Sequence, residues 1–310
     1  MGVPKSAAAA LSHAKRIARR YEGITGVDFG YAFKNGRRTA KQAIRFHVGR
    51  KKSVKDIGKM QVIPENIHNI QCDVIEAEYR PHQGSDNLVP GMSVGNLAHR
   101  ATGTLGLTVM DLQGGVRCVL SNWHVLGGSP ECVVGQEIIQ PGPGNLGTSD
   151  PAHKIGELMR WTNLVHGYDA AIARLTVETT SSNFIASSQL NVLTTAEPKL
   201  GMRVVKQGLA SGFTHALIDG VGGSFPINYS NFGDTTRWMN GVHLVPDQAH
   251  LDAEITLEGD SGAAWCEAST GYAVALNFAG ESGLGPLSDY ALAHPLPRVF
   301  ELLQIKLPDK

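Results

Sequence analysis

The sequence predicts a mainly β protein in which a small α+β module precedes a larger body of short strands. From residue 92 onward, short apolar runs are separated by glycines. The chain has 36 glycines and only 6% aromatic residues, a composition typical of many strands joined by tight turns. Residues 1–80 instead show one helical repeat followed by alternating, strand-like patterns. The length of 310 residues is enough for one large or two ordinary domains.

The predicted module, residues 1–80, begins with a helix. Its apolar residues recur at helical spacing (Leu11, Ala14, Ile17, Ala18 and Tyr21). This repeat favours a folded amphipathic helix over a mitochondrial transit segment, which the basic, Ala-rich composition also resembles. Alternating apolar residues on both sides of Asn35-Gly36 predict a hairpin, and residues 71–80 predict a third strand. Residues 81–91 are rich in Pro, Gly, Ser and Asn and are predicted to be a linker.

Charge is distributed unevenly along the chain. Residues 1–60 hold 15 Lys or Arg and 3 Asp or Glu, a net charge of +12. The net charge of the whole chain is zero, so residues 61–310 carry a net charge of −12. A basic module of this kind suggests a partner or oligomer contact. We expect it to dock on the acidic body of its own chain or of a neighbouring subunit. An acidic partner protein is the second possibility. Nucleic acid is the least expected partner. The aromatic residues of the module alternate along the strands, as residues of a core do, so few aromatic rings are left to stack on bases.

The composition also limits the cellular setting. No run of 18 apolar residues exists, and the N-terminus lacks the apolar core of a secretory signal. The four cysteines show no metal-ligand spacing. Cys118 and Cys132 could bridge, but without an export signal free thiols are favoured. We therefore expect a cytoplasmic protein with no membrane contact, no metal and no cofactor.

Three polar residues lie in segments that could together carry acyl-transfer chemistry. His124 follows an apolar run in "CVLSNWHVLGG", Asp169 directly precedes another in "GYDAAIARL", and Ser261 lies in "LEGDSGAAW". A serine hydroxyl becomes a nucleophile when an imidazole takes its proton, and a carboxylate must orient that imidazole. The order His, Asp, Ser therefore predicts a catalytic triad.

These segments resemble those of the chymotrypsin-like serine proteases. The wider set "VLSNWHVL", "IIQPGPGN", "YDAAIA" and "KQGLASGFT", with the N-terminal module, resembles the trypsin-like proteases related to the plant narrow-leaf protein and their bacterial counterparts. The resemblance implies a double antiparallel β-barrel in residues 92–310. Barrel one would span about 92–180, barrel two about 195–295, and a C-terminal helix about 296–305. It implies an endopeptidase with an oxyanion hole formed by the N–H groups of Gly259 and Ser261.

The resemblance also locates a substrate pocket. It is expected at Ile255, Thr256 and the segment "NFAG" (Asn277, Phe278, Ala279 and Gly280). None of these side chains can pair with Arg or Lys, so an apolar or small residue is expected before the cut bond. In the secreted relatives a newly cut N-terminus pairs with the aspartate before the serine. Here the preceding module prevents this, so Asp260 should have another partner or only shape the turn.

A second function class is open at this point. The triad segments could belong to a catalytically silent protease fold that acts as a binding module for an acidic protein or nucleic acid. Labelling by a fluorophosphonate separates the two, because only an activated serine reacts with it.

Overall fold

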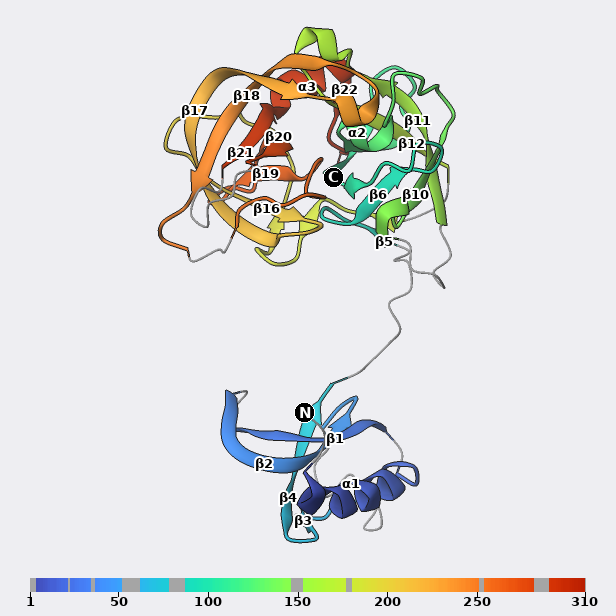
Figure 1. Ribbon diagram of the computed structural model, residues 1–310, viewed down its shortest axis with the longest axis vertical. Coiled ribbons are helices and arrows are strands. Elements are labelled where there is room, and N and C mark those ends of the chain that lie inside the picture. Colours follow the sequence, from blue (N-terminus) through green and yellow to red (C-terminus); the bar gives the residue numbers. More distant parts are fainter. Residues whose placement is uncertain are drawn as a thin grey trace. The chain divides into compact units, whose positions relative to one another are not determined.

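The computed structural model of the chain (Figure 1) describes residues 4–21, 23–34, 37–51, 62–77, 87–145, 153–176, 180–250, 254–281 and 290–309. The chain divides into two compact units, Met1–Gln83 and Gly84–Lys310. Each unit has hydrophobic core clusters made only of its own residues.

The N-terminal unit is one helix packed on a mixed sheet. Its elements are α1 (Lys5–Ala18), β1 (Ile24–Lys34), β2 (Arg37–Val48), β3 (Asn66–Ile67) and β4 (Ile70–Glu76). The strand order is β1-β2-β4-β3, with β2 and β4 parallel. Small residues of α1, such as Ala10 and Ala14, let the helix approach Ile44 and Phe46 closely. The predicted helix and hairpin strands are present, whereas the predicted Asn35-Gly36 turn lies outside the described residues.

The predicted third strand is shorter than expected. β4 ends at Glu76, and residues 78–80 lie outside the described part of the chain. Most of the predicted linker 81–91 also lies outside it. Two residues of that linker form β5 (Asn87–Leu88), which pairs in parallel with β13 (Thr180–Ser181).

The first half of the larger unit is a curled antiparallel sheet (Figure 1). Its order is β22-β8-β9-β12-β11-β10-β6-β7. The strands are β6 (Ser93–Asn96), β7 (Gly103–Thr104), β8 (Leu107–Asp111), β9 (Arg117–Ser121), β10 (Glu137–Gln140), β11 (His153–Trp161), β12 (Ala171–Leu175) and β22 (Ile305–Lys306). β8, β9 and β12 are largely buried on both faces, which explains why they appear as nearly continuous apolar runs in the sequence.

The second half is a closed barrel of order β16-β17-β18-β21-β20-β19. Its strands are β16 (Arg203–Gly208), β17 (Gly212–Asn228), β18 (Thr236–Pro246), β19 (Ala264–Glu267), β20 (Ala273–Gly280) and β21 (Ala291–Pro295). Between the halves lie β14 (Phe184–Ile185) and β15 (Leu190–Asn191), a short hairpin. The long β17–β18 hairpin carries a short helical turn, η5 (Ser230–Phe232), at its end. The predicted mainly β class is thus confirmed.

The C-terminal segment joins the two halves. The helix predicted at about 296–305 is present as α3 (Leu296–Leu303). It ends where Gln304 adopts a φ of 49°, and β22 then pairs with β8. A shared core cluster contains Leu120 of the sheet, Leu276 of the barrel and Val299 of α3. This cluster fixes the two halves against each other. No helix in the described ranges is long and apolar enough to cross a membrane.

Candidate active site

His124 lies where β9 of the sheet gives way to a short helix. Asn122 adopts an extended conformation (φ −76°, ψ 159°) and precedes α2 (Trp123–Leu126). This sharp change of direction turns His124 out of the strand, and only 8% of its surface is exposed. The apolar run before His124 is thus strand β9, and the histidine itself lies in the short helix that follows it.

Asp169 lies two residues before β12, which pairs with β9 so that Ala171 is opposite Ser121. This register brings the carboxylate to the histidine. Asp169 Oδ2 lies 2.5 Å from His124 Nδ1, and Asp169 Oδ1 accepts a hydrogen bond from the His124 backbone N–H at 3.1 Å. Because Nδ1 is bound in this way, Nε2 is the ring nitrogen left for a reacting group.

Two side chains from the barrel half also contact Asp169. The Tyr229 hydroxyl donates to Oδ2 at 2.8 Å, and His294 Nε2 accepts from the Asp169 backbone N–H at 3.0 Å. The other ring nitrogen of His294, Nδ1, lies 2.6 Å from the Asn240 carbonyl and must donate to it. His294 therefore carries its single proton on Nδ1 and is neutral in this arrangement.

The surroundings set the charge of this cluster. Burial by itself would raise the pKa of Asp169, but His124 and the Tyr229 hydroxyl lower it, and the pKa lies below its ordinary value. Burial lowers the pKa of His294 to about 4. Burial and Asp169 together raise the pKa of Tyr229, so its hydroxyl keeps the proton that it donates. The site at neutral pH thus holds an ionised, fully buried carboxylate.

Ser261 lies in the loop between β18 and β19, flanked by two glycines with positive φ. Gly259 has a φ of 105° and Gly262 a φ of 93°, values that L side chains rarely adopt. A Cβ at Gly262 would also lie 2.0 Å from Ser121 Oγ and 2.4 Å from the Thr104 carbonyl oxygen. The glycines of the motif are therefore required by the backbone turn and by the close approach of the loop to the sheet.

The same loop lies close to the histidine helix. A Cβ at Gly103 would lie 2.5 Å from Val125 Cγ2 and 2.8 Å from the Ser261 carbonyl oxygen. Val125, the residue after His124, and Ser261 thus both flank this one glycine. The three residues predicted as a triad come from three separate segments that meet where the sheet and the barrel join.

Asp260 is held by a lysine in the barrel. Lys206 Nζ lies 2.8 Å from Asp260 Oδ2, and both side chains are fully buried. Lys206 Nζ also donates to Ser211 Oγ, whose hydroxyl donates to Asp260. Burial would raise the pKa of Asp260, but Lys206 and Ser211 lower it overall. The other partner expected for Asp260 is therefore Lys206.

The residues predicted to line a substrate pocket fall into two groups. Thr256 and Asn277 hydrogen-bond each other at 3.1 Å, and a Cβ at Gly280 would lie 2.5 Å from the Thr256 methyl group. The remaining pair is buried, as Thr256 and Asn277 also are: Ile255 lies in the barrel core, and Phe278 is stacked on His294 at 3.9 Å between ring centroids. Ala279 is half-buried.

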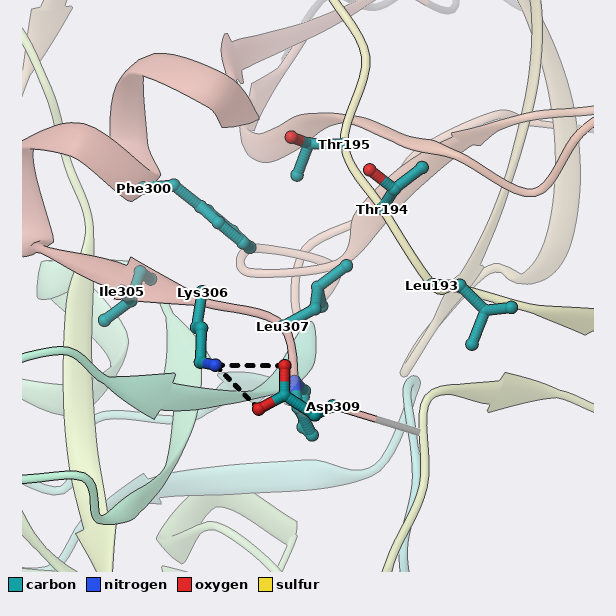
Figure 2. A pocket seen from close by; sticks show the side chains of 9 residues that line it. Leu193, Thr194, Thr195, Phe300, Ile305, Lys306, Leu307 and Asp309 are labelled. Carbon is teal, nitrogen blue, oxygen red and sulfur yellow. Dashed lines mark hydrogen bonds and ion pairs between the residues drawn. The ribbon is translucent and has the colours of Figure 1, made fainter.

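A separate cavity of about 400 Å³ lies away from these residues. α3, β22 and residues 193–195 form it, and Lys306 and Asp309 pair beside it at 2.7 Å (Figure 2). Apolar atoms of Phe300, Leu307 and Leu193 line much of it (Figure 2). None of the predicted site residues lines this cavity.

Solved structures share the architecture of this chain. The Nocardiopsis protease NAPase matches with a TM-score of 0.52 at 15% identity, over 72% of this chain and 100% of its own. The chymotrypsin-like serine protease fold is present here. Thermobifida fusca protease A matches with a TM-score of 0.51 at 15% identity, over 72% of this chain and 100% of its own. A serine protease specific for glutamic acid matches with a TM-score of 0.51 at 15% identity, over 71% of this chain and 100% of its own.

No family model and no curated protein sequence matches the chain. The resemblance to the narrow-leaf protein and its bacterial relatives therefore stays a prediction, whereas the chymotrypsin-like protease fold expected from the sequence is confirmed.

Sequence reasoning missed four residues that support the site: Thr104, Lys206, Tyr229 and His294. Two of them had a detectable signal. Lys206 interrupts the apolar run of "RVVKQG" and His294 that of "YALAHP", and a polar group in a buried strand requires a partner. Tyr229 had none, because it lies 60 residues from Asp169 along the chain.

Proposed function

We propose that the chain is a serine endopeptidase in which His124, Asp169 and Ser261 form the catalytic triad. The observation that carries this proposal is the buried bond of 2.5 Å between His124 Nδ1 and Asp169 Oδ2. A fully buried carboxylate that holds one ring nitrogen leaves the other to act as a base. The protease fold of the solved neighbours supports a protein or peptide substrate.

In the proposed reaction His124 Nε2 takes the proton of Ser261 Oγ as the oxygen attacks the peptide carbonyl carbon. The resulting oxyanion is held by the N–H groups of Gly259 and Ser261. Neither N–H donates to a protein acceptor among the described residues. His124 then gives its proton to the leaving amine, and an acyl-enzyme forms on Ser261. A water deprotonated by His124 hydrolyses this ester and restores the serine.

The substrate site is proposed at Thr256, Asn277 and Gly280. The described part of this cluster contains no carboxylate that could pair with a substrate Lys or Arg. Together with the close packing of Thr256 on Gly280, this supports a small or apolar residue before the scissile bond.

The compartment proposed is the cytoplasm. All four cysteines are free thiols, and Cys118, Cys132 and Cys266 are buried. A chain that holds its fold without a disulfide is suited to a reducing environment. Activity that is unchanged by millimolar thiol would support this, and loss of activity in thiol would contradict it.

The proposed activity is tested by fluorophosphonate labelling. The wild-type chain should label at Ser261, identified by peptide mass spectrometry, and should hydrolyse casein. Ser261→Ala should do neither, whereas the control Ser187→Ala, which removes an exposed hydroxyl, should behave as wild type. A wild-type chain that neither labels nor hydrolyses casein would contradict the proposal and favour the catalytically silent binding module.

A further inference from the structure

Thr104, at the end of β7, joins the sheet half to the loop that carries Ser261. It is fully buried, and all of its polar groups are bonded. Its N–H donates to the Ser261 carbonyl at 2.8 Å, and its own carbonyl accepts from Ser121 Oγ at 2.7 Å. Its hydroxyl donates to the Gly259 carbonyl at 2.7 Å and accepts from the Leu209 N–H at 3.1 Å. One side chain thus connects the loops at 209 and 259 of the barrel.

The Thr104 hydroxyl helps to fix the backbone of Gly259. The φ of Gly259 is 105°, a value that glycine adopts readily, and a Cβ at this position would meet only Ala210 at 3.5 Å and Leu209 at 3.8 Å, which are ordinary contacts. Side-chain packing at Gly259 is therefore not tight. Glycine gains wide backbone freedom in such a setting. Two hydrogen bonds restrain its ψ: Thr104 donates to the Gly259 carbonyl, and the Asp260 N–H of the same peptide unit donates to the Leu257 carbonyl at 3.0 Å.

The carbonyls of Gly259 and Ser261 are hydrogen-bonded within the described part of the protein, whereas their N–H groups are not. The carbonyls of Gly259 and Ser261 are both bound by Thr104, one by its hydroxyl and one by its N–H. The N–H groups of the same two residues have no acceptor among the described residues. The bonds to the carbonyls fix the backbone of the loop, and they leave the N–H groups of Gly259 and Ser261 without an acceptor in the described part of the protein, so that a developing negative oxygen can accept from them.

We propose that Thr104 is a positioning residue whose hydroxyl, by holding the Gly259 carbonyl, keeps the Gly259 N–H directed at the oxyanion. This inference rests on the proposed function. Thr104 touches neither substrate nor the reacting atoms, so its effect is on the stabilisation of the transition state. The carbonyl oxygen of the bound substrate carries no full charge before the reaction. The binding of substrate in the ground state should therefore depend on Thr104 far less.

The test compares Thr104→Val, which removes the hydroxyl at nearly constant volume, with Thr104→Ser, which keeps it. Thr104→Val should lower kcat about tenfold, as expected for one lost buried hydrogen bond acting on the transition state. KM should change less than about twofold. Thr104→Ser should restore most of kcat. A peptide aldehyde, whose adduct with Ser261 carries the oxyanion, should bind Thr104→Val about tenfold more weakly.

Thr108→Val is the matched control. Thr108 is buried on β8, the next strand along the chain, and its hydroxyl has no hydrogen-bond partner among the described residues. Its replacement removes the same atom from the same sheet without breaking a bond, so kcat and aldehyde affinity should stay at wild-type values.

All rates are expressed per active site, counted by fluorophosphonate titration, and melting temperatures are recorded for every variant. If Thr104→Val lowers only the melting temperature or the fraction of active molecules, while kcat per active site is unchanged, Thr104 is merely structural and the inference is wrong. If wild type itself does not react with the fluorophosphonate, the proposed function has failed instead.

Discussion

Lys206 Nζ lies 2.8 Å from Asp260 Oδ2 in the interior of the barrel half, and neither side chain is exposed to solvent. Asp260 immediately precedes Ser261, so this ion pair anchors the loop that carries the serine. Both charges are supplied within the described part of the chain. The loop is therefore held in place without an ion pair from a newly cut N-terminus, and the uncut chain should label with fluorophosphonate.

Removing the lysine should destabilise the chain strongly. Lys206→Met leaves Asp260 buried and unpaired, which should lower the free energy of unfolding by about 3–5 kcal/mol. Urea unfolding measures this change. Lys154→Met is the control, because Lys154 pairs with Glu157 at the surface and exposed pairs contribute little; its unfolding should match wild type. Equal stability of Lys206→Met and wild type would show that the pair does not anchor the loop.

The orientation of His124 depends on the charge of Asp169. Asp169→Asn keeps the shape but presents an amide, which favours the wrong imidazole tautomer, and kcat should fall on the order of ten-thousandfold. Ser261→Ala and His124→Ala should each abolish hydrolysis to a similar extent, because the two residues act as one unit. Asp219→Asn, at an exposed carboxylate, is the control and should have no effect. Retention of full activity in Asp169→Asn would rule out this triad.

Tyr229 should contribute to catalysis through Asp169. Tyr229→Phe removes the hydroxyl that donates to Asp169 Oδ2 and should lower kcat about tenfold, since a bond to a buried charge is lost. The ring, which packs near His124 and Trp123, is kept. Tyr272→Phe, at a surface position, should leave kcat unchanged. If Tyr229→Phe has the kcat of wild type, the hydroxyl does not contribute to catalysis and Tyr229 acts only through the packing of its ring.

His294 should make stability depend on pH in a defined window. The folded chain keeps His294 neutral down to about pH 4, whereas an unfolded histidine has a pKa of about 6.5. Between these values the unfolded chain binds one more proton than the folded chain. The contribution of His294 to the free energy of unfolding is therefore fully present above about pH 6.5. As the pH falls to 4, roughly 3 kcal/mol of it is lost.

This dependence is measured by urea unfolding at several values of pH from 4 to 8. His294→Gln cannot titrate, so its stability should fall less steeply over the same window. Comparing slopes removes any constant effect of the substitution. An unchanged slope in His294→Gln would mean that other groups cause the acid dependence.

The proposed substrate site at Thr256, Asn277 and Gly280 predicts the specificity of cleavage. A peptide library should show small or apolar residues before the cut bond, with Lys and Arg disfavoured, because no carboxylate lies in the described part of this cluster. The same library incubated with Ser261→Ala serves as the control, and any cleavage seen there is subtracted as the activity of contaminating proteases. A profile dominated by Lys or Arg would place the pocket elsewhere.

Local sequence determined much of this protein. The apolar runs punctuated by glycine are sufficient to predict short strands, because the side-chain period of a strand and the turn preference of glycine are properties of neighbouring residues. The motifs around His124, Asp169 and Ser261 have the same local character. Each combines a polar side chain with the turn or strand end that positions it, and the three could be proposed as one site from their order in the chain.

Tertiary structure decided which distant residues support these three. Lys206 meets Asp260 and Tyr229 meets Asp169 only after strands far apart in the chain pair and close the barrel. The end of α3 at Leu303 was likewise set by the pairing of β22 with β8, which outweighs the helical repeat. Such contacts depend on strand register and burial. A lysine in an apolar run, such as Lys206, indicates that a partner is needed, because burial makes an unpaired charge costly. The identity of that partner is decided by the tertiary structure.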